Sequence, residues 1–181
     1  MSDEPNADLA ALIRTIPDYP KPGILFRDIT TLLLDAHGLG QAIDRLTRVA
    51  ADLKPDLIAG IEARGFVFGA AVAKALGCGL LLVRKKNKLP GPVLGVNYAL
   101  EYGQDRIEIH ADACTPGARV LIVDDLIATG GTALATVQLL RQARAVVVGA
   151  GFVIDLPDLG GASRLRADGV RVDTLISFAG D

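Results

Sequence analysis

The chain has 181 residues, half of them apolar and 22% charged, and its formal net charge is −2 at pH 7. This balance excludes a disordered chain and favours a single domain, residues 1–181, with a large buried sheet. The small net charge and the lack of a long basic run exclude a general nucleic-acid binder. No apolar run reaches the roughly 20 residues that span a bilayer, and the acidic, polar N-terminus is unlike a signal peptide. We therefore expect a cytoplasmic protein with no membrane partner.

The first part of the chain alternates between helical and extended signals. Residues 7–15 have the apolar period of a short amphipathic helix. Prolines and a glycine in residues 17–23 then force an extended segment, and apolar residues return at 24–26. A second helical period covers residues 38–53 and is followed by a proline.

From residue 57 onward, short apolar segments alternate with helical ones. We predict strands at 57–61, 80–83, 119–123, 145–154 and 170–176, and helices at 66–76 and 131–141. Short, continuously apolar strands separated by helices are typical of a parallel sheet covered on both faces. The sequence therefore predicts an α/β fold with a doubly wound, mainly parallel sheet.

A cationic, turn-rich segment interrupts this alternation. Residues 84–92 (RKKNKLPGP) carry the densest group of cations in the chain, and residues 93–109 have the pattern of two strands joined near Gly103. We expect this inserted hairpin, about residues 84–109, to act as a mobile flap. Part of the cationic group can equally be a solvated face.

The strongest functional signal is residues 120–132 (VLIVDDLIATGGT), in which a predicted buried strand ends in Asp124 and Asp125. A loop of small residues then leads into a helix. Ligands of open α/β sheets bind outside the carboxyl ends of the strands, and glycines let the amides at a helix start approach an anion. The loop is a predicted cradle for a monophosphate, formed by Ala128, Thr129, Gly130, Gly131 and Thr132.

The two carboxylates narrow the choice of phosphate compound. A Walker A loop would need a lysine that this loop lacks, and the Rossmann fingerprint is also missing. Asp124 and Asp125 suit the 2- and 3-hydroxyls of a ribose, or a Mg²⁺ ion reached directly or through water. Ribose 5-phosphate fits this pairing best; the alternative is an Asp-Asp turn that only caps the following helix.

This motif resembles the phosphoribosyl pyrophosphate motif of the type I phosphoribosyltransferases. More narrowly, the chain from about residue 12 to its C-terminus is similar to the adenine-specific members of that family. The matching segments are residues 16–28 (IPDYPKPGILFRD), 60–69 (GIEARGFVFG), 88–91 (KLPG), 100–103 (LEYG), 120–132 and 154–161 (IDLPDLGG). The resemblance implies the type I fold, with an N-terminal hood over about residues 12–35. It also implies purine salvage, in which the phosphoribosyl group of 5-phosphoribosyl 1-pyrophosphate is transferred to adenine, giving AMP and pyrophosphate.

The resemblance assigns the pyrophosphate to cationic segments. Ala63 and Arg64 are expected to receive it, with Ala63 standing where some family members have serine. The flap residues Arg84 and Lys85 add positive charge. Lys88 is expected to reach the pyrophosphate of a neighbouring subunit, which implies a homodimer. Arg64 can alternatively be a surface ion-pair partner.

The base is assigned to the hood. The backbone around Leu25 and Arg27 is expected to read the hydrogen-bonding edge of adenine, while Phe26 and Leu126 supply apolar surface. Phe26 can alternatively be a core residue beneath the N-terminal arm. Because backbone readout leaves no side-chain code, a phosphoribosyltransferase for hypoxanthine, guanine or xanthine remains an alternative.

Catalysis is expected to depend on positioning and on cations that stabilise the leaving pyrophosphate, Arg64 among them. Glu101 is the candidate for proton exchange with the purine ring, and Tyr102 is expected to orient it or pack beside the sugar. Glu101 can alternatively be an exposed hairpin residue. The implied cofactor is Mg²⁺, held mainly through the substrate, with Asp124 and Asp125 as further candidates. A non-catalytic sensor of phosphoribosyl pyrophosphate is the remaining alternative.

Overall fold

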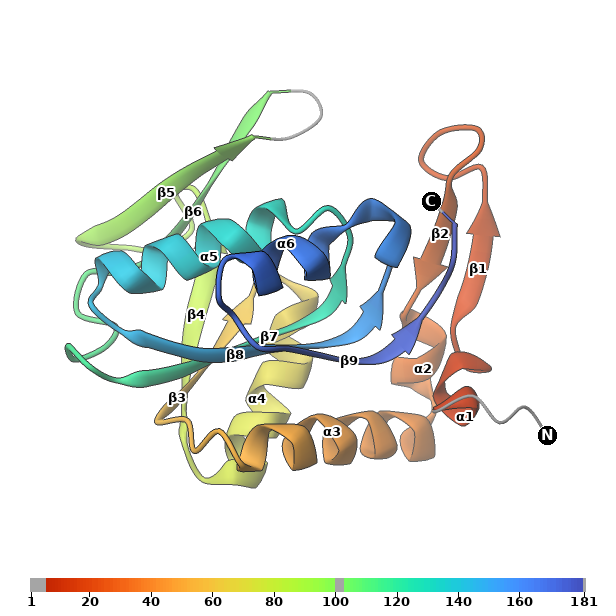
Figure 1. Cartoon of the computed structure of the whole chain (residues 1–181), viewed down its shortest axis with the longest axis horizontal. Helices are drawn as coiled ribbons and strands as arrows, with labels where there is room; N and C mark the ends of the chain where they lie inside the picture. Colours follow the sequence, from red (N-terminus) through yellow and green to blue (C-terminus); the bar gives the residue numbers. More distant parts are fainter. Residues whose placement is uncertain (1–5, 100–102, 181) are drawn as a thin grey trace.

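The computed structural model describes residues 6–99 and 103–180 (Figure 1). Its strands are β1 Arg14–Pro17, β2 Leu25–Asp28, β3 Leu57–Ile61, β4 Gly79–Lys85, β5 Val93–Ala99, β6 Gln104–His110, β7 Arg119–Ile127, β8 Val146–Asp155 and β9 Val172–Ser177. Its helices are α1 Ala7–Ala10, α2 Thr30–Leu34, α3 Ala36–Ala51, α4 Arg64–Leu76, α5 Gly131–Gln142 and α6 Gly161–Ala167, with a 3₁₀ turn, η1, at Pro157–Leu159.

The large sheet has the strand order β5-β6-β4-β3-β7-β8-β9. Five neighbouring strands run parallel to one another: β4, β3, β7, β8 and β9. In contrast, β6 pairs antiparallel with both β4 and β5. After β3 the chain crosses to β4 on one side, and after β7 it crosses to β8 on the other, so the winding direction changes between β3 and β7. The prediction of a doubly wound, mainly parallel sheet with an inserted hairpin is confirmed.

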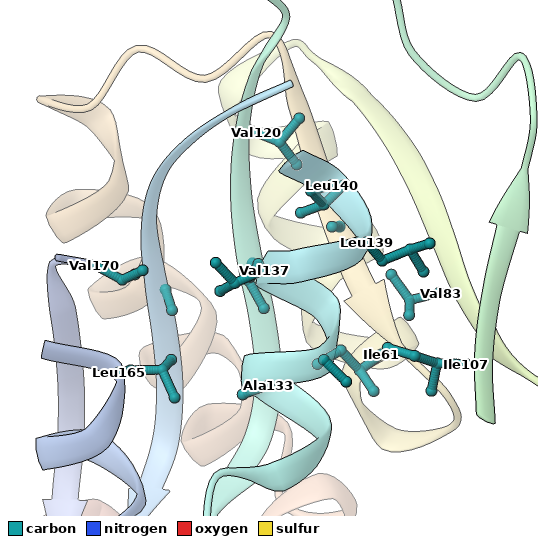
Figure 2. Packing of buried hydrophobic residues seen from close by; sticks show 14 of the residues in the cluster. Ile61, Val83, Ile107, Val120, Ala133, Val137, Leu139, Leu140, Leu165 and Val170 are labelled. Atoms are coloured by element: carbon teal, nitrogen blue, oxygen red, sulfur yellow. The ribbon is translucent and has the colours of Figure 1, made fainter. Parts of the chain in front are cut away.

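Helices cover both faces of this sheet, with α5 and α6 on one face and α3 and α4 on the other (Figure 1). On the first face, Val137 and Leu139 of α5 belong to one buried cluster with Ile61, Val83 and Val120 of the sheet (Figure 2). This apolar layer stabilises the sheet but contributes no polar groups. Side chains that could take part in a reaction are therefore expected at the ends of the strands. No helix within the described part of the chain is long and apolar enough to cross a membrane.

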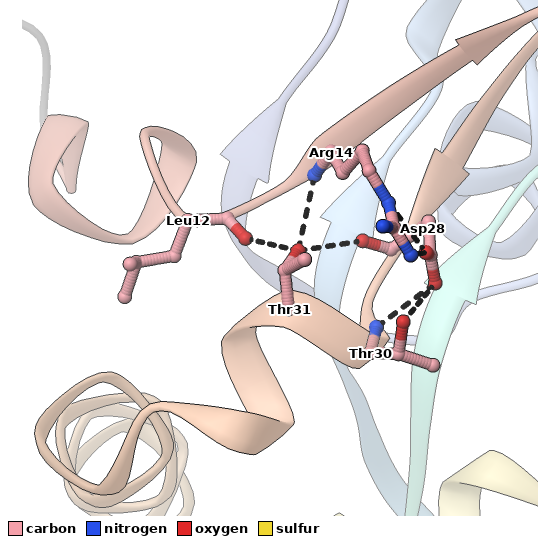
Figure 3. A network of polar contacts seen from close by, with 5 residues as sticks. All are labelled: Leu12, Arg14, Asp28, Thr30 and Thr31. Carbon is pink, nitrogen blue, oxygen red and sulfur yellow. Dashed lines mark hydrogen bonds and ion pairs between the residues drawn. The ribbon is translucent and has the colours of Figure 1, made fainter.

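The hood is built on a separate antiparallel pair, β1 and β2, next to α1 and α2. Asp28 closes its base: it accepts hydrogen bonds from the Thr30 hydroxyl (2.7 Å), the Thr30 amide (3.0 Å) and the Arg14 guanidinium (Figure 3). The Thr31 hydroxyl donates to the carbonyl of Leu12 at 2.6 Å. The Thr30 hydroxyl and the Arg14 guanidinium lower the pKa of Asp28 to about 2, so this carboxylate is ionised when it anchors the two strands.

Two local predictions are wrong. The helix predicted over residues 7–15 ends at Ala10, and Arg14–Pro17 is instead strand β1. The proline at 17 disfavours helical geometry at the residue before it, and pairing with β2 supplies the hydrogen bonds that a helix would have made. The strand predicted to stop at 123 continues to Ile127, because β8 pairs with this part of β7 as well.

Candidate functional site

A cavity of about 600 Å³ lies at the carboxyl ends of β3 and β7, where the winding of the sheet changes direction. This is the position at which open α/β sheets bind ligands. Its walls also include parts of β4 and of the flap strands β5 and β6. The predicted substrate-binding residues that line it are Ala63, Arg64, Lys85, Asp124, Asp125, Leu126, Ala128, Thr129, Gly130, Gly131 and Thr132.

The paired carboxylates lie near the end of β7 and both line the cavity. Asp125 is 4% exposed and forms an ion pair with Nε of Arg64. Oδ1 of Asp124 accepts a hydrogen bond from the amide of Asp125 at 2.8 Å. Burial, and then the neighbouring charge of Asp125, raise the pKa of Asp124 well above its usual value. Hydrogen-bond donors or a cation placed at this pair would stabilise its ionised form.

A close approach of α4 to β7 places Arg64 opposite the carboxylates. A Cβ added to Gly65 would lie 2.8 Å from Oδ1 of Asp124 and 2.8 Å from the carbonyl oxygen of Val123. Only glycine permits this spacing without a shift of the backbone. The Arg64 side chain is about half exposed, so its guanidinium borders the cavity while it pairs with Asp125.

The loop after β3 is tied to the cationic segment by Glu62. Its carboxylate accepts hydrogen bonds from the Lys85 amide (2.9 Å) and from Nε of Arg84 (3.2 Å). Burial by itself would raise the pKa of Glu62. The Lys85 amide and the Arg84 guanidinium together lower it by more than burial raises it, so the pKa of Glu62 lies below its usual value. Nη1 of Arg84 also donates to the Lys88 carbonyl at 3.1 Å. Arg84 therefore holds the turn that carries Lys88, and neither residue belongs to the cavity lining.

The predicted phosphate cradle, residues 128–132, runs into the start of α5. The first amides of a helix have no partner within it, and here the start of α5 lines the cavity. Gly130 has φ +80°, and a Cβ there would lie 2.9 Å from Cα of Gly161. The amide of Gly161 donates to the Ala128 carbonyl at 3.0 Å. In the sequence, residues 154–161 stand out only because they match the family. In the structure, this segment packs behind the predicted phosphate cradle and supports it.

On the flap side, the cavity is lined by two polar residues, Tyr98 and Asp105, that were not predicted from the sequence. Tyr98 and Asp105 are a directly opposed pair of β5 and β6. Oη of Tyr98 donates to Oδ2 of Asp105 at 3.0 Å, and Nζ of Lys85 lies 3.7 Å from the same oxygen. Burial is the main cause of a raised pKa for Tyr98. Only the exact hairpin register identifies this pair, because a hairpin centred on Gly103 would place Glu108 opposite Tyr98.

Comparison with known proteins agrees with this geometry. The phosphoribosyl transferase domain family matches residues 30–179 of the chain. The adenine phosphoribosyltransferase of Sphingopyxis alaskensis is 60% identical over 178 residues, which are 98% of this chain and 97% of that protein. The chain belongs to the adenine phosphoribosyltransferase family.

Solved structures of that family have the same fold. The adenine phosphoribosyltransferase of Thermoanaerobacter pseudethanolicus is 46% identical with a TM-score of 0.90, over 95% of this chain and 99% of that one. The adenine phosphoribosyltransferase of Saccharomyces cerevisiae is 38% identical with a TM-score of 0.87, over 94% and 97% of the two chains. The yeast enzyme was crystallised with adenine and an imino-altritol bisphosphate.

The remaining residues predicted for the phosphoribosyltransferase site lie elsewhere. Leu25, Phe26 and Arg27 are on β2, outside the cavity lining. Leu25 is 37% exposed, and the ring of Phe26 meets that of Tyr19 edge to face at 5.2 Å. The candidates for proton transfer, Glu101 and Tyr102, lie outside the described residues.

Proposed function

We propose that this chain catalyses adenine phosphoribosyl transfer for purine salvage, forming AMP and pyrophosphate from adenine and 5-phosphoribosyl 1-pyrophosphate. One observation carries the proposal: a single cavity joins paired carboxylates, a glycine–threonine loop at a helix start, and a cationic loop. Each of these suits one part of the ribose donor. The names of the relatives agree with this pentosyl transfer.

The donor is proposed to lie along the cavity. Its 5-phosphate meets the amides and threonine hydroxyls of residues 128–132. Asp124 and Asp125 accept hydrogen bonds from the ribose 2- and 3-hydroxyls. Arg64 and Lys85, which line the same cavity, meet the pyrophosphate.

When the donor binds, the ion pair between Arg64 and Asp125 must open, and each of the two side chains must find a new partner in the donor. Because Asp125 is 4% exposed, a carboxylate that lost the guanidinium without replacement would be buried and unpaired, at a considerable cost in free energy. Ribose hydroxyls supply the replacement donors, and the released Arg64 turns to the pyrophosphate. Both groups therefore remain satisfied after the exchange.

The reaction forms a bond from C1 of the ribose to a purine nitrogen while the bond from C1 to the pyrophosphate oxygen breaks. Positive charge develops on the sugar, and negative charge leaves with the pyrophosphate, where Arg64 and Lys85 stabilise it. The purine nitrogen loses its proton as the new bond forms. Glu101 is the proposed acceptor of that proton, with Tyr102 beside it; in sequence both lie between β5 and β6.

Mg²⁺ is the proposed cofactor. Among the described residues there is no group of three or more histidine, cysteine or acidic side chains that could hold a metal. Asp124 and Asp125 offer oxygen ligands at the cavity wall, which fits an ion that keeps several waters and binds through one or two carboxylates and substrate phosphates. When bound, the ion would neutralise charge on the pyrophosphate.

Adenine is proposed to bind between the cavity and the hood. Leu126 lines the cavity on the side of β7 and supplies apolar surface there. The backbone of Leu25 and Arg27 is the proposed reader of the base edge, with Phe26 against the ring. This assignment rests on the resemblance. The cytoplasmic location stays a prediction from the sequence.

A homodimer is the proposed assembly. Leu80 and Leu82 of β4 are 36% and 40% exposed, and Val67 of α4 is 45% exposed. Leu80 and Leu82 are two residues apart on β4 and therefore share one face of the sheet, and exposed large apolar side chains that share a surface are typical of contact sites between proteins. A second copy covering this surface would bring its own β4 close, and with it the turn that carries Lys88. Sedimentation equilibrium tests this: a monomer at micromolar concentration contradicts the proposed assembly.

The test of the enzymatic role is AMP formation from adenine, the ribose donor and Mg²⁺, with pyrophosphate measured in parallel. Equal amounts of AMP and pyrophosphate are expected over many turnovers. Donor binding without turnover would favour the non-catalytic sensor instead.

A further inference from the structure

The C-terminal tail, residues 178–180, leaves β9 and runs beside the hood strand β2 (Figure 1). Among the described residues, β1 and β2 form a sheet of their own, with no strand pairing to the large sheet. The position of the hood relative to the cavity therefore depends on side-chain contacts and on segments such as this tail.

The tail holds the side chain of Arg27. The guanidinium carbon of Arg27 lies 4.5 Å from the centre of the Phe178 ring, a distance at which a cation is attracted to the face of an aromatic ring. Nη2 of Arg27 donates to the Ala179 carbonyl at 3.1 Å, and Nη1 donates to the Thr15 hydroxyl of β1 at 2.7 Å. One arginine thus joins both hood strands to the tail.

The tail is in turn fixed to the large sheet and its loops. The amide of Phe178 donates to the Asp155 carbonyl of β8 at 3.0 Å. The amide of Gly180 donates to Oδ2 of Asp158 in η1 at 2.7 Å. The contacts therefore run continuously from the end of β8, through the tail, to the strand that carries Leu25, Phe26 and Arg27.

We propose that Phe178 and Asp158 are positioning residues for the purine base: they fix the tail that fixes Arg27, and so set the backbone of β2 over the cavity. The inference rests on the proposed base-binding role of the hood. Phe178 packs against the same buried apolar cluster as Leu126 and Ala128 of the cavity lining. The hydrogen bonds of the tail, however, run to Arg27, Asp155 and Asp158, so we expect the main effect on the base rather than on the ribose donor.

Steady-state kinetics of Phe178→Ala and Asp158→Ala test this. Loss of the ring contact is expected to raise KM for adenine roughly two- to thirtyfold. KM for the ribose donor and kcat at saturating adenine should stay within about twofold of the parent. Phe178→Tyr keeps an aromatic face for Arg27 and should restore KM for adenine. Asp158 is exposed, so its substitution tests the tail even where Phe178→Ala lowers stability.

Two further variants separate the possible outcomes. Asp168→Ala removes an exposed ion pair with Arg141, at the far end of α5 from the cavity, and should leave both KM values unchanged.

Phe26→Ala reports on the hood itself. If Phe26→Ala raises KM for adenine while Phe178→Ala and Asp158→Ala do not, the positioning role is wrong and the base site stands. If none of the three changes it, the base site itself is wrong. An equal rise in both KM values would also overturn the positioning role.

Discussion

Replacing Asp28 with asparagine is expected to destabilise the protein by about 2 kcal/mol near neutral pH. The Thr30 hydroxyl, the Arg14 guanidinium and the Thr30 amide lower the pKa of Asp28 from 3.8 to about 2. At about 1.4 kcal/mol per pKa unit, this difference corresponds to about 2 kcal/mol of preference for the ionised form in the folded state. Asparagine is similar in shape but has no charge, and its amide group would face the Arg14 donors (Figure 3).

The effect has a defined pH dependence. Because the folded pKa is the lower one, the charge contributes fully above the unfolded pKa of 3.8. It contributes progressively less as the pH falls toward the folded pKa of about 2, where both states become protonated. The stability gap between parent and Asp28→Asn should therefore be constant from about pH 7 to pH 5 and shrink below about pH 4.

Urea unfolding followed by circular dichroism measures this gap. Asp18→Asn is the matched control in the same hood, since Asp18 is exposed and accepts a hydrogen bond from the Gly23 amide at 2.8 Å. That control should change the free energy of unfolding by less than about 0.5 kcal/mol. The reasoning would be refuted if Asp28→Asn lowered the free energy of unfolding no more than the control does. It would also be refuted if the difference between parent and Asp28→Asn stayed constant down to about pH 3.

Three further predictions concern the site. Asp125→Asn should raise KM for the ribose donor roughly tenfold or more by weakening hydrogen bonds to the ribose; unchanged donor binding in calorimetry would contradict that role. Glu101→Gln should lower kcat by roughly 10²- to 10⁴-fold with donor affinity nearly intact, and unchanged turnover in initial-rate assays would remove Glu101 from the mechanism. Gly65→Ala should weaken donor binding, since the new Cβ meets Asp124 at 2.8 Å; normal donor affinity in a folded variant would show that the close approach is dispensable.

The sheet could be predicted because its strands are short, apolar and separated by helices. Local pattern could not place β1: Pro17 disfavours a helix there, but the strand itself is made by pairing with β2 and by the contact of Arg14 with Asp28. The true end of β7 was hidden for a similar reason, because its last residues are held by β8. Each miss depends on a partner that is distant in the sequence.

The candidate site also has one part that could be predicted from the sequence and another part that depends on strand pairing. Asp124, Asp125 and the loop after them are contiguous, so their chemistry can be read directly from the chain. Tyr98 and Asp105 meet only through the hairpin register, and Lys85 joins them because β6 pairs with β4. Glu62 gives no signal in the sequence beyond being an acid before Arg64, yet it holds the turn that carries Lys88 through Arg84.

The most direct test of the central claim is a spectrophotometric assay with the ribose donor, Mg²⁺ and each purine base in turn. The account predicts rapid formation of AMP from adenine, and no comparable turnover of hypoxanthine, guanine or xanthine. Turnover of another purine with little activity on adenine would contradict the assignment of the hood while leaving the phosphate and ribose sites intact.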